Sequence, residues 1–172
     1  MKRLTRTGLS LSTIALFGLG TAVLLAQGNN RGKAEATVGP AHVSIDYGRP
    51  MLKGRNPLEM IKPGQIWRLG ANAPTTIDTD HDLLFGKTRV PKGKHILLAH
   101  MVEPGKWTLL VSDKAANEYE PGAKIAEVPM KLESARDSVE KMTIKLSGHQ
   151  RRGDIEVAWG TSRLAASFEV AQ

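Results

Sequence analysis

Apolar residues recur at every second position over most of the chain beyond residue 42, and this period constrains the fold more than any other feature. Successive side chains of a β-strand point to opposite faces, so alternation places one set against a core and the other toward water. The stretches that follow the rule are Val43–Tyr47, Val128–Leu132, Met142–Leu146, Ile155–Trp159 and Leu164–Val170. The pattern predicts an antiparallel sheet with one buried face.

Two further stretches, Ile96–Val102 and Trp107–Val111, are apolar at nearly every position. Continuous apolar runs of this length indicate strands that are covered on both faces. Pro104-Gly105 between them is typical of a tight turn, because glycine supplies the positive φ that a type II turn needs. Short strands joined by glycine and proline turns favour an all-β fold, an antiparallel β-sandwich of jelly-roll or immunoglobulin-like type.

A single short helix is expected near 56–62. Asn56 is a favourable cap, Pro57 suits the first helical position, and Glu59 completes a capping box. Lys62-Pro63 would end this helix after barely two turns.

The N-terminus has the pattern of a secretory signal peptide. Three basic residues within the first six positions precede an apolar segment, Leu9–Ala26, which is followed by small residues. We expect cleavage after Gly28 and export to the periplasm or the cell exterior. The alternative is an uncleaved N-terminal anchor, because the apolar segment is about long enough to cross a bilayer.

The expected division is a signal peptide over 1–28, a linker over 29–41 and one domain over 42–172. The linker is expected because 29–41 combine glycine, alanine and charged residues without a period. The chain contains no cysteine, which excludes disulfides, thiolate metal ligands and a lipid-modified cysteine. A domain of about 150 residues buries enough surface to fold without such links.

The charge balance argues against a nucleic-acid partner. Loss of Lys2, Arg3 and Arg6 with the signal peptide would reduce the 24 basic residues to 21, against 17 acidic ones, a net charge of +4. Nucleic-acid binding usually needs a dense basic face and stacking aromatic residues.

Sequence motifs give no support for a metal site, a cofactor or a catalytic residue set. The three alternating aspartates of 78–82 resemble a calcium loop, but Leu83 and Arg89 stand where such a loop needs glycine and glutamate. The histidines lack the spacing of a zinc-binding helix, and no Gly-x-Ser-x-Gly motif occurs. We therefore predict no metal, no cofactor and no catalytic residue.

Positive charge gathers on turns between two expected strands. The stretch from Arg49 to Arg68 has a net charge of +4, and loops held by a rigid scaffold are where binding sites usually lie. Arginine offers a planar fork for carboxylate or phosphate, and a tryptophan can line a pocket or a sugar-binding surface. The candidate ligand-binding residues are Arg49, Lys53, Arg55, Trp67, Arg68 and Asn72.

The alternative for these residues is structural. Tyr47 and Trp67 would then belong to the core. Arg49 and Arg68 would pair internally with one of three aspartates, namely Asp46, Asp78 or Asp80.

Four short motifs in this region resemble a known family. They are Asp46-Tyr47-Gly48-Arg49-Pro50, Lys53-Gly54-Arg55, Trp67-Arg68-x-Gly70-Ala71-Asn72 and Thr75-Thr76. In combination they are similar to the signature of a bacterial secreted family, domain of unknown function 2911, over about His42 to Val111. The resemblance implies an exported domain and no particular activity.

The chain departs from the family pattern at three positions. In the family pattern, threonine is common at the position of Leu69, glutamate at the position of Ala73 and tyrosine at the position of His95. A site that uses such a hydroxyl or carboxylate would bind a different ligand, or none, in this chain.

The expected function is that of a non-catalytic binding module in the cell envelope. Its partner would be an anionic or polyhydroxy small molecule or an envelope glycan, with membrane contact only through an uncleaved N-terminal segment. The alternatives are a hydrolase acting on an envelope polymer, with Asp46 as its best candidate carboxylate, and a structural or assembly domain that uses a strand edge.

Overall fold

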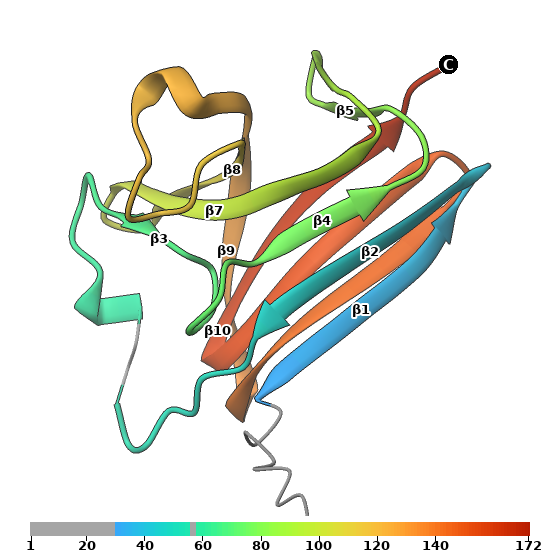
Figure 1. The fold of residues 1–172 in the computed structure, drawn as a ribbon. Coiled ribbons are helices and arrows are strands. Elements are labelled where there is room, and N and C mark those ends of the chain that lie inside the picture. The colour runs from blue at the N-terminus through green and yellow to red at the C-terminus, as the bar shows by residue number, and fades with distance from the viewer. Residues whose placement is uncertain (1–29, 56–57) are drawn as a thin grey trace, which may run out of the picture.

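A computed structural model describes residues 30–55 and 58–172 and contains one antiparallel sheet of ten strands (Figure 1). The strands are β1 (Arg31–Val38), β2 (Ala41–Gly48), β3 (Ile66–Trp67), β4 (Thr76–Thr79), β5 (Leu83–Phe85), β6 (Thr88–Val90), β7 (Gly93–Glu103), β8 (Lys106–Ser112), β9 (Lys124–His149) and β10 (Arg152–Val170). Their order is β1-β2-β4-β7-β8-β9-β10-β5-β6, and β3 pairs with β7 beside this path. The sheet does not close on itself. The prediction of an all-β antiparallel fold is confirmed.

The predicted alternation sets the buried face of the sheet. Val43, Ile45 and Tyr47 of β2 are buried, whereas Ser44 and Asp46 between them are partly exposed. The same alternation holds for both ends of β9 and for β10. Together these inward residues form one hydrophobic core.

The middle parts of the two continuous apolar runs are buried on both faces, whereas Val102 at the end of the first run is 42% exposed. Leu97, Leu98 and Ala99 of β7 are all at most 1% exposed, and so are three consecutive residues of β8, Leu109–Val111. Figure 1 shows the connection between β8 and β9, which contains the 3-10 turn η2 (Pro121–Ala123), arching beside these strands. Its hydrogen bonds to the end of β8 hold it there.

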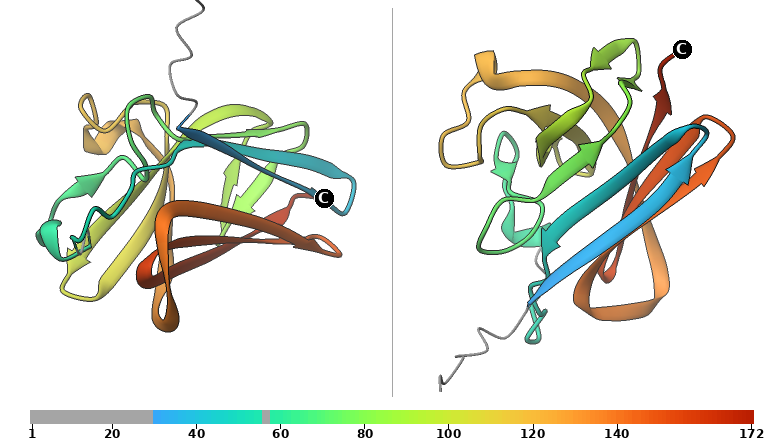
Figure 2. Two further views of the ribbon diagram at one scale, coloured as in Figure 1. Left: turned by 90° about the horizontal axis from the view of Figure 1, so that it is seen from below. Right: turned by 45° about the vertical axis from the view of Figure 1, so that its right-hand side comes forward.

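The pairing of β9 with β10 shifts register twice, between Ala158 and Gly160 and again between Gly160 and Ser162. Gly160 pairs with Val139, and Ser162 pairs with Ser134, so β9 carries several extra residues opposite Thr161. Such insertions bend a strand and increase its twist. Figure 2 shows the resulting bend, and Leu132, expected to be buried, lies just before it and is 38% exposed.

The segment expected to be a linker, 29–41, instead contains β1, which pairs with β2 along its whole length. The inward residues of β1 include Ala34 and Val38, both buried. Alanine gives a weak hydrophobic signal, so the period of β1 was not visible in the sequence.

The helix expected near 56–62 is a short 3-10 turn, η1 (Leu58–Met60). Tertiary pairing ends it early, because the Gly64 amide donates to the Met101 carbonyl at 2.6 Å and draws the chain alongside β7. The proposed cap, Asn56-Pro57, lies outside the described residues, as does the predicted signal peptide. No helix of the described residues is long and apolar enough to cross a membrane.

The end of β2 is joined to the second half of β9. The Tyr47 hydroxyl donates to the Ile144 carbonyl at 3.3 Å. Just beyond β2, the chain pairs briefly with β9: the Leu52 amide donates to the Glu140 carbonyl, and the Met142 amide to the Pro50 carbonyl, both at 2.9 Å. These bonds hold the start of the turn that carries Lys53 and Arg55 against β9.

Candidate functional site

Two sequence motifs meet at the end of β2 because glycines allow their backbones to touch. A Cβ added to Gly48 would lie 2.7 Å from the Ala71 nitrogen, and one added to Gly70 would lie 3.0 Å from the Gly48 carbonyl oxygen. The buried Thr75 hydroxyl donates to the Leu69 carbonyl at 2.8 Å and fixes the second motif. We call the region formed by residues 48–55 and 67–72 the cationic corner.

Arg49 links the corner to β9. Its Nε donates to the Met142 carbonyl at 3.1 Å, and its Nη2 donates to the Thr143 hydroxyl at 3.0 Å. Its backbone amide donates to the Asn30 carbonyl at 2.6 Å. The side chain is partly buried and its donors serve the fold, so Arg49 positions the corner.

Lys53 and Arg55 lie on an exposed turn. Lys53 has a φ of 50° and donates its backbone amide to the Glu140 carboxylate at 3.1 Å. The Arg55 amide donates to the Leu52 carbonyl at 3.1 Å. The Arg55 Nε also donates to the Leu52 carbonyl at 3.4 Å, and both charged side chains are exposed.

Arg68 and Asn72 lie together on the second motif. The Arg68 Nη1 donates to the Asn72 carbonyl at 3.2 Å, and both residues are exposed. Asn72 has a φ of 62°, a conformation that asparagine tolerates better than most residues. The bond holds the guanidinium close to the turn.

Trp67 belongs to an aromatic cluster. Its ring stacks on Trp159 of β10, with centroids 5.9 Å apart and planes at 11°, and it meets the edge of Trp107 at 6.3 Å. Trp67 is partly buried against the core. The Nε1 of Trp159 is buried and lacks a hydrogen-bond partner among the described residues. Sequence reasoning did not connect the three tryptophans, because they lie on three strands far apart in the chain.

The cations of the corner form no ion pair within the described residues, although the Glu140 carboxylate lies at the Lys53 backbone amide. None of the ion pairs among the described residues involves the five cations of this stretch, which are Arg49, Lys53, Arg55, Lys62 and Arg68. Asp46, considered both as an internal partner and as a hydrolytic carboxylate, is ion-paired with Arg31. The binding role of the six candidate residues stays a prediction.

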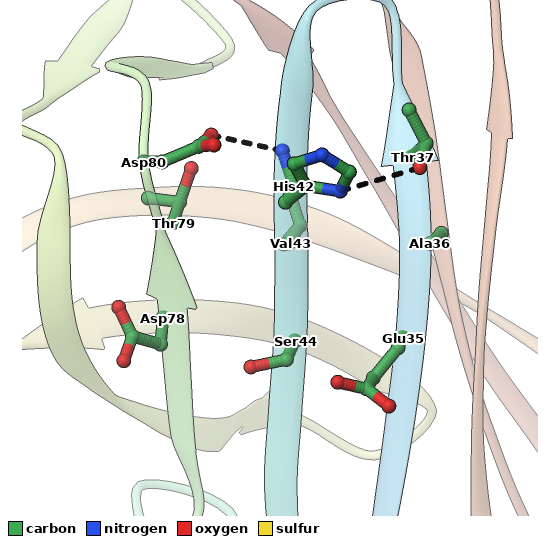
Figure 3. A pocket seen from close by; sticks show the side chains of 9 residues that line it. All are labelled: Glu35, Ala36, Thr37, His42, Val43, Ser44, Asp78, Thr79 and Asp80. Carbon is green, nitrogen blue, oxygen red and sulfur yellow. Dashed lines mark hydrogen bonds between the residues drawn. The ribbon is translucent and has the colours of Figure 1, made fainter.

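A hollow of about 550 Å³ lies elsewhere, on the outward face of β1, β2 and β4 (Figure 3). Glu35, Ser44 and Asp78 form one cross-strand row in it, because each pairs with the next. Asp80 accepts hydrogen bonds from the His81 ring at 2.7 Å and from the His42 amide at 2.8 Å. These bonds, that of His81 foremost, lower the pKa of Asp80.

This hollow does not contain any of the six candidate residues. No group of histidine and carboxylate side chains within the described residues is arranged to hold a metal ion. The hollow's three carboxylates, those of Glu35, Asp78 and Asp80, are exposed.

Comparison with known protein families places the chain in one of them. The model of a family described as "Protein of unknown function (DUF2911)" matches residues 29–168. No curated protein and no solved structure matches the chain. The match begins just before β1 and ends within β10, so it spans nearly the whole sheet rather than the motif region alone.

Proposed function

The chain belongs to the DUF2911 family of proteins of unknown function, and we propose that it is an exported, non-catalytic binding module of the cell envelope. The N-terminal pattern of basic, apolar and small residues supports export and cleavage after Gly28. We place the protein in the periplasm or outside the cell.

We also propose that the sheet folds over into two packed layers and so forms a β-sandwich, of jelly-roll or immunoglobulin-like type. The contacts of β2 with the second half of β9 support this, since strands distant in the sheet order then face each other across the core. Such a scaffold holds its connecting turns rigidly, which suits them to ligand recognition.

The proposed ligand is anionic or polyhydroxy and binds at the cationic corner. One observation carries this: the side-chain cations of the corner form no ion pair within 4.0 Å among the described residues, and Lys53, Arg55 and Arg68 are exposed. Uncompensated cations attract anions and steer them to the surface. The guanidinium groups also donate directional hydrogen bonds, which orient the ligand in a way that positive charge alone does not.

In this proposal the six candidate residues have different tasks. Arg49 holds the corner against β9. Lys53, Arg55 and Arg68 supply charge, and Asn72 supplies a donor and an acceptor. Trp67, stacked on Trp159, gives the corner a rigid aromatic support.

Calorimetric titration with sucrose octasulfate and with unmodified sucrose tests the proposal. The sulfated sugar probes the anionic class and sucrose the polyhydroxy class. We expect at least one to bind, and the double variant Arg55→Ala/Arg68→Ala to lower its affinity roughly tenfold or more, about 1.4 kcal/mol.

The matched control is Lys87→Ala/Lys114→Ala. It removes the same charge from two exposed lysines that form no ion pair among the described residues. We expect it to change the affinity less than about twofold, because distant surface charges are screened by salt. Equal losses in the two double variants, or no binding of either sugar, would refute the proposal.

A further inference from the structure

A second hollow, separate from the acidic one in Figure 3, lies on the outward face of β2, β4, β7 and β8 and measures about 550 Å³. Its floor is a cross-strand row in which Asp46 pairs with Thr76, Thr76 with Ile96, and Ile96 with Ser112. Ala73 and Pro74 form one rim, and Asp113 lies at the other. A volume of this size is typical of small-molecule sites.

Hydrogen bonds hold both rims in place. Arg31 donates to the Pro74 carbonyl at 3.2 Å while its Nε donates to Asp46 at 2.6 Å, so this guanidinium ties one rim to the floor. At the other rim, the buried Ser112 hydroxyl donates to the Ala123 carbonyl at 3.1 Å. A cavity with fixed walls binds with a smaller entropic cost than one that must form around its ligand.

The charges of the hollow are only partly satisfied by the protein. Arg31 and Asp46 neutralise each other. Lys94 and Asp113 also line the hollow, yet neither takes part in an ion pair among the described residues, so their charged atoms lie more than 4.0 Å from each other. Lys94 and Asp113 therefore line the same hollow without an ion pair within 4.0 Å, and the carboxylate opposite Lys94 in the strand register is that of Asp78, outside the hollow.

We infer that this hollow binds a small zwitterion, an amino acid or a short peptide with both ends free. The ligand carboxylate would meet Lys94, its ammonium would meet Asp113, and an apolar side chain would lie on Ile96 and Pro74. Two opposite charges on one ligand satisfy both groups at once, whereas a simple anion or cation satisfies one and repels the other. His95 takes no part, because its Nε2 is bonded to the Pro91 carbonyl at 2.7 Å.

Calorimetry with the dipeptide Ala-Leu tests the inference. Acetylation of its amino end removes the ammonium, and amidation of its carboxyl end removes the carboxylate. We expect Ala-Leu to bind, and each blocked form to bind about tenfold more weakly or worse, since it leaves one charge of the hollow unpaired. Binding of a blocked form with equal affinity would overturn the inference, and so would no binding of Ala-Leu at about 10 mM, roughly ten times a Kd of about 1 mM.

Variants of residues in the hollow and of residues elsewhere on the surface test whether Ala-Leu binds in this hollow. Lys94→Met and Asp113→Asn should each weaken Ala-Leu binding about tenfold. The controls Lys87→Met and Glu118→Gln alter exposed charges outside the hollow and should leave binding unchanged. Unchanged binding in the Lys94 and Asp113 variants would contradict the assignment.

The inference does not depend on the cationic corner. Arg55→Ala/Arg68→Ala should retain Ala-Leu binding, and Lys94→Met should retain the sugar binding expected at the corner. Failure of either proposal is therefore visible without reference to the other.

Discussion

Replacing Gly48 by alanine should disrupt the contact that brings the two motifs together. A Cβ at this position would lie 2.7 and 2.8 Å from the Ala71 nitrogen and carbonyl carbon, and closer still to its oxygen. Real Cβ atoms essentially never approach other atoms within 3.0 Å, so the Ala71 backbone must move. Gly48 is buried and is not among the glycines with positive φ, so the cost comes from crowding and not from backbone strain.

Overpacking of this kind costs typically 1–3 kcal/mol and sometimes more. Backbone yields less easily than a side chain, so we expect about 3 kcal/mol for Gly48→Ala. For a domain of this size that corresponds to a fall in Tm of roughly 6–12 °C. Guanidinium unfolding followed by tryptophan fluorescence measures the change, because the aromatic cluster lies near the corner.

Gly122→Ala is the matched control. A Cβ there meets nothing within 4 Å, and Gly122 has no positive φ. This variant should be neutral or slightly stabilising, because alanine restricts the unfolded chain. If the two variants unfold within about 0.5 kcal/mol of each other, the close approach of the motifs described above is refuted.

Three further predictions concern single side chains. Arg49→Met should destabilise the protein by about 1.5–3 kcal/mol, measured by denaturant unfolding, because two hydrogen bonds from a charged group to β9 are lost; a change below about 0.5 kcal/mol would contradict this. Trp67→Ala should cost about 2–3 kcal/mol in the same assay, below the range for a fully buried tryptophan, because the ring is only partly buried; a neutral result would show that the stack is unimportant. For Asp80, hydrogen bonds from His81 and His42 lower the pKa in the folded state. The carboxylate therefore stabilises the fold above its unfolded pKa, and this stabilisation is lost as the pH falls through its folded pKa. Asp80→Asn should therefore flatten the acid side of the stability profile, and an unchanged profile would count against these bonds.

The sequence period predicts much of the sheet because large apolar residues carry the signal. Val43, Ile45 and Tyr47 reveal β2, while β1 escapes notice because Ala34 and Ala36 are too small to mark an inward face. The bend in β9 is also hidden. The bend arises because β9 has more residues than β10 between successive paired positions, and the period of one strand does not reveal its register with another.

The candidate site was predicted as a list of residues and not as an arrangement. Glycine, proline and charge locate the turns, but the contact of Gly48 with Ala71 joins segments that no local rule connects. The two residues of β9 that accept hydrogen bonds from the Arg49 side chain, Met142 and Thr143, lie over 90 positions away in the chain. Arg31, which neutralises Asp46, lies in the stretch that had no visible strand pattern.

The exposed guanidinium groups of the cationic corner can be observed directly by NMR of the arginine Nε–H groups during titration with sucrose octasulfate. We predict that Arg55 and Arg68 shift together and saturably. Arg89 and Arg152, which are exposed but ion-paired with aspartates, should hardly change. Shifts spread evenly over all four arginines, or confined to the paired ones, would contradict a binding site at this corner.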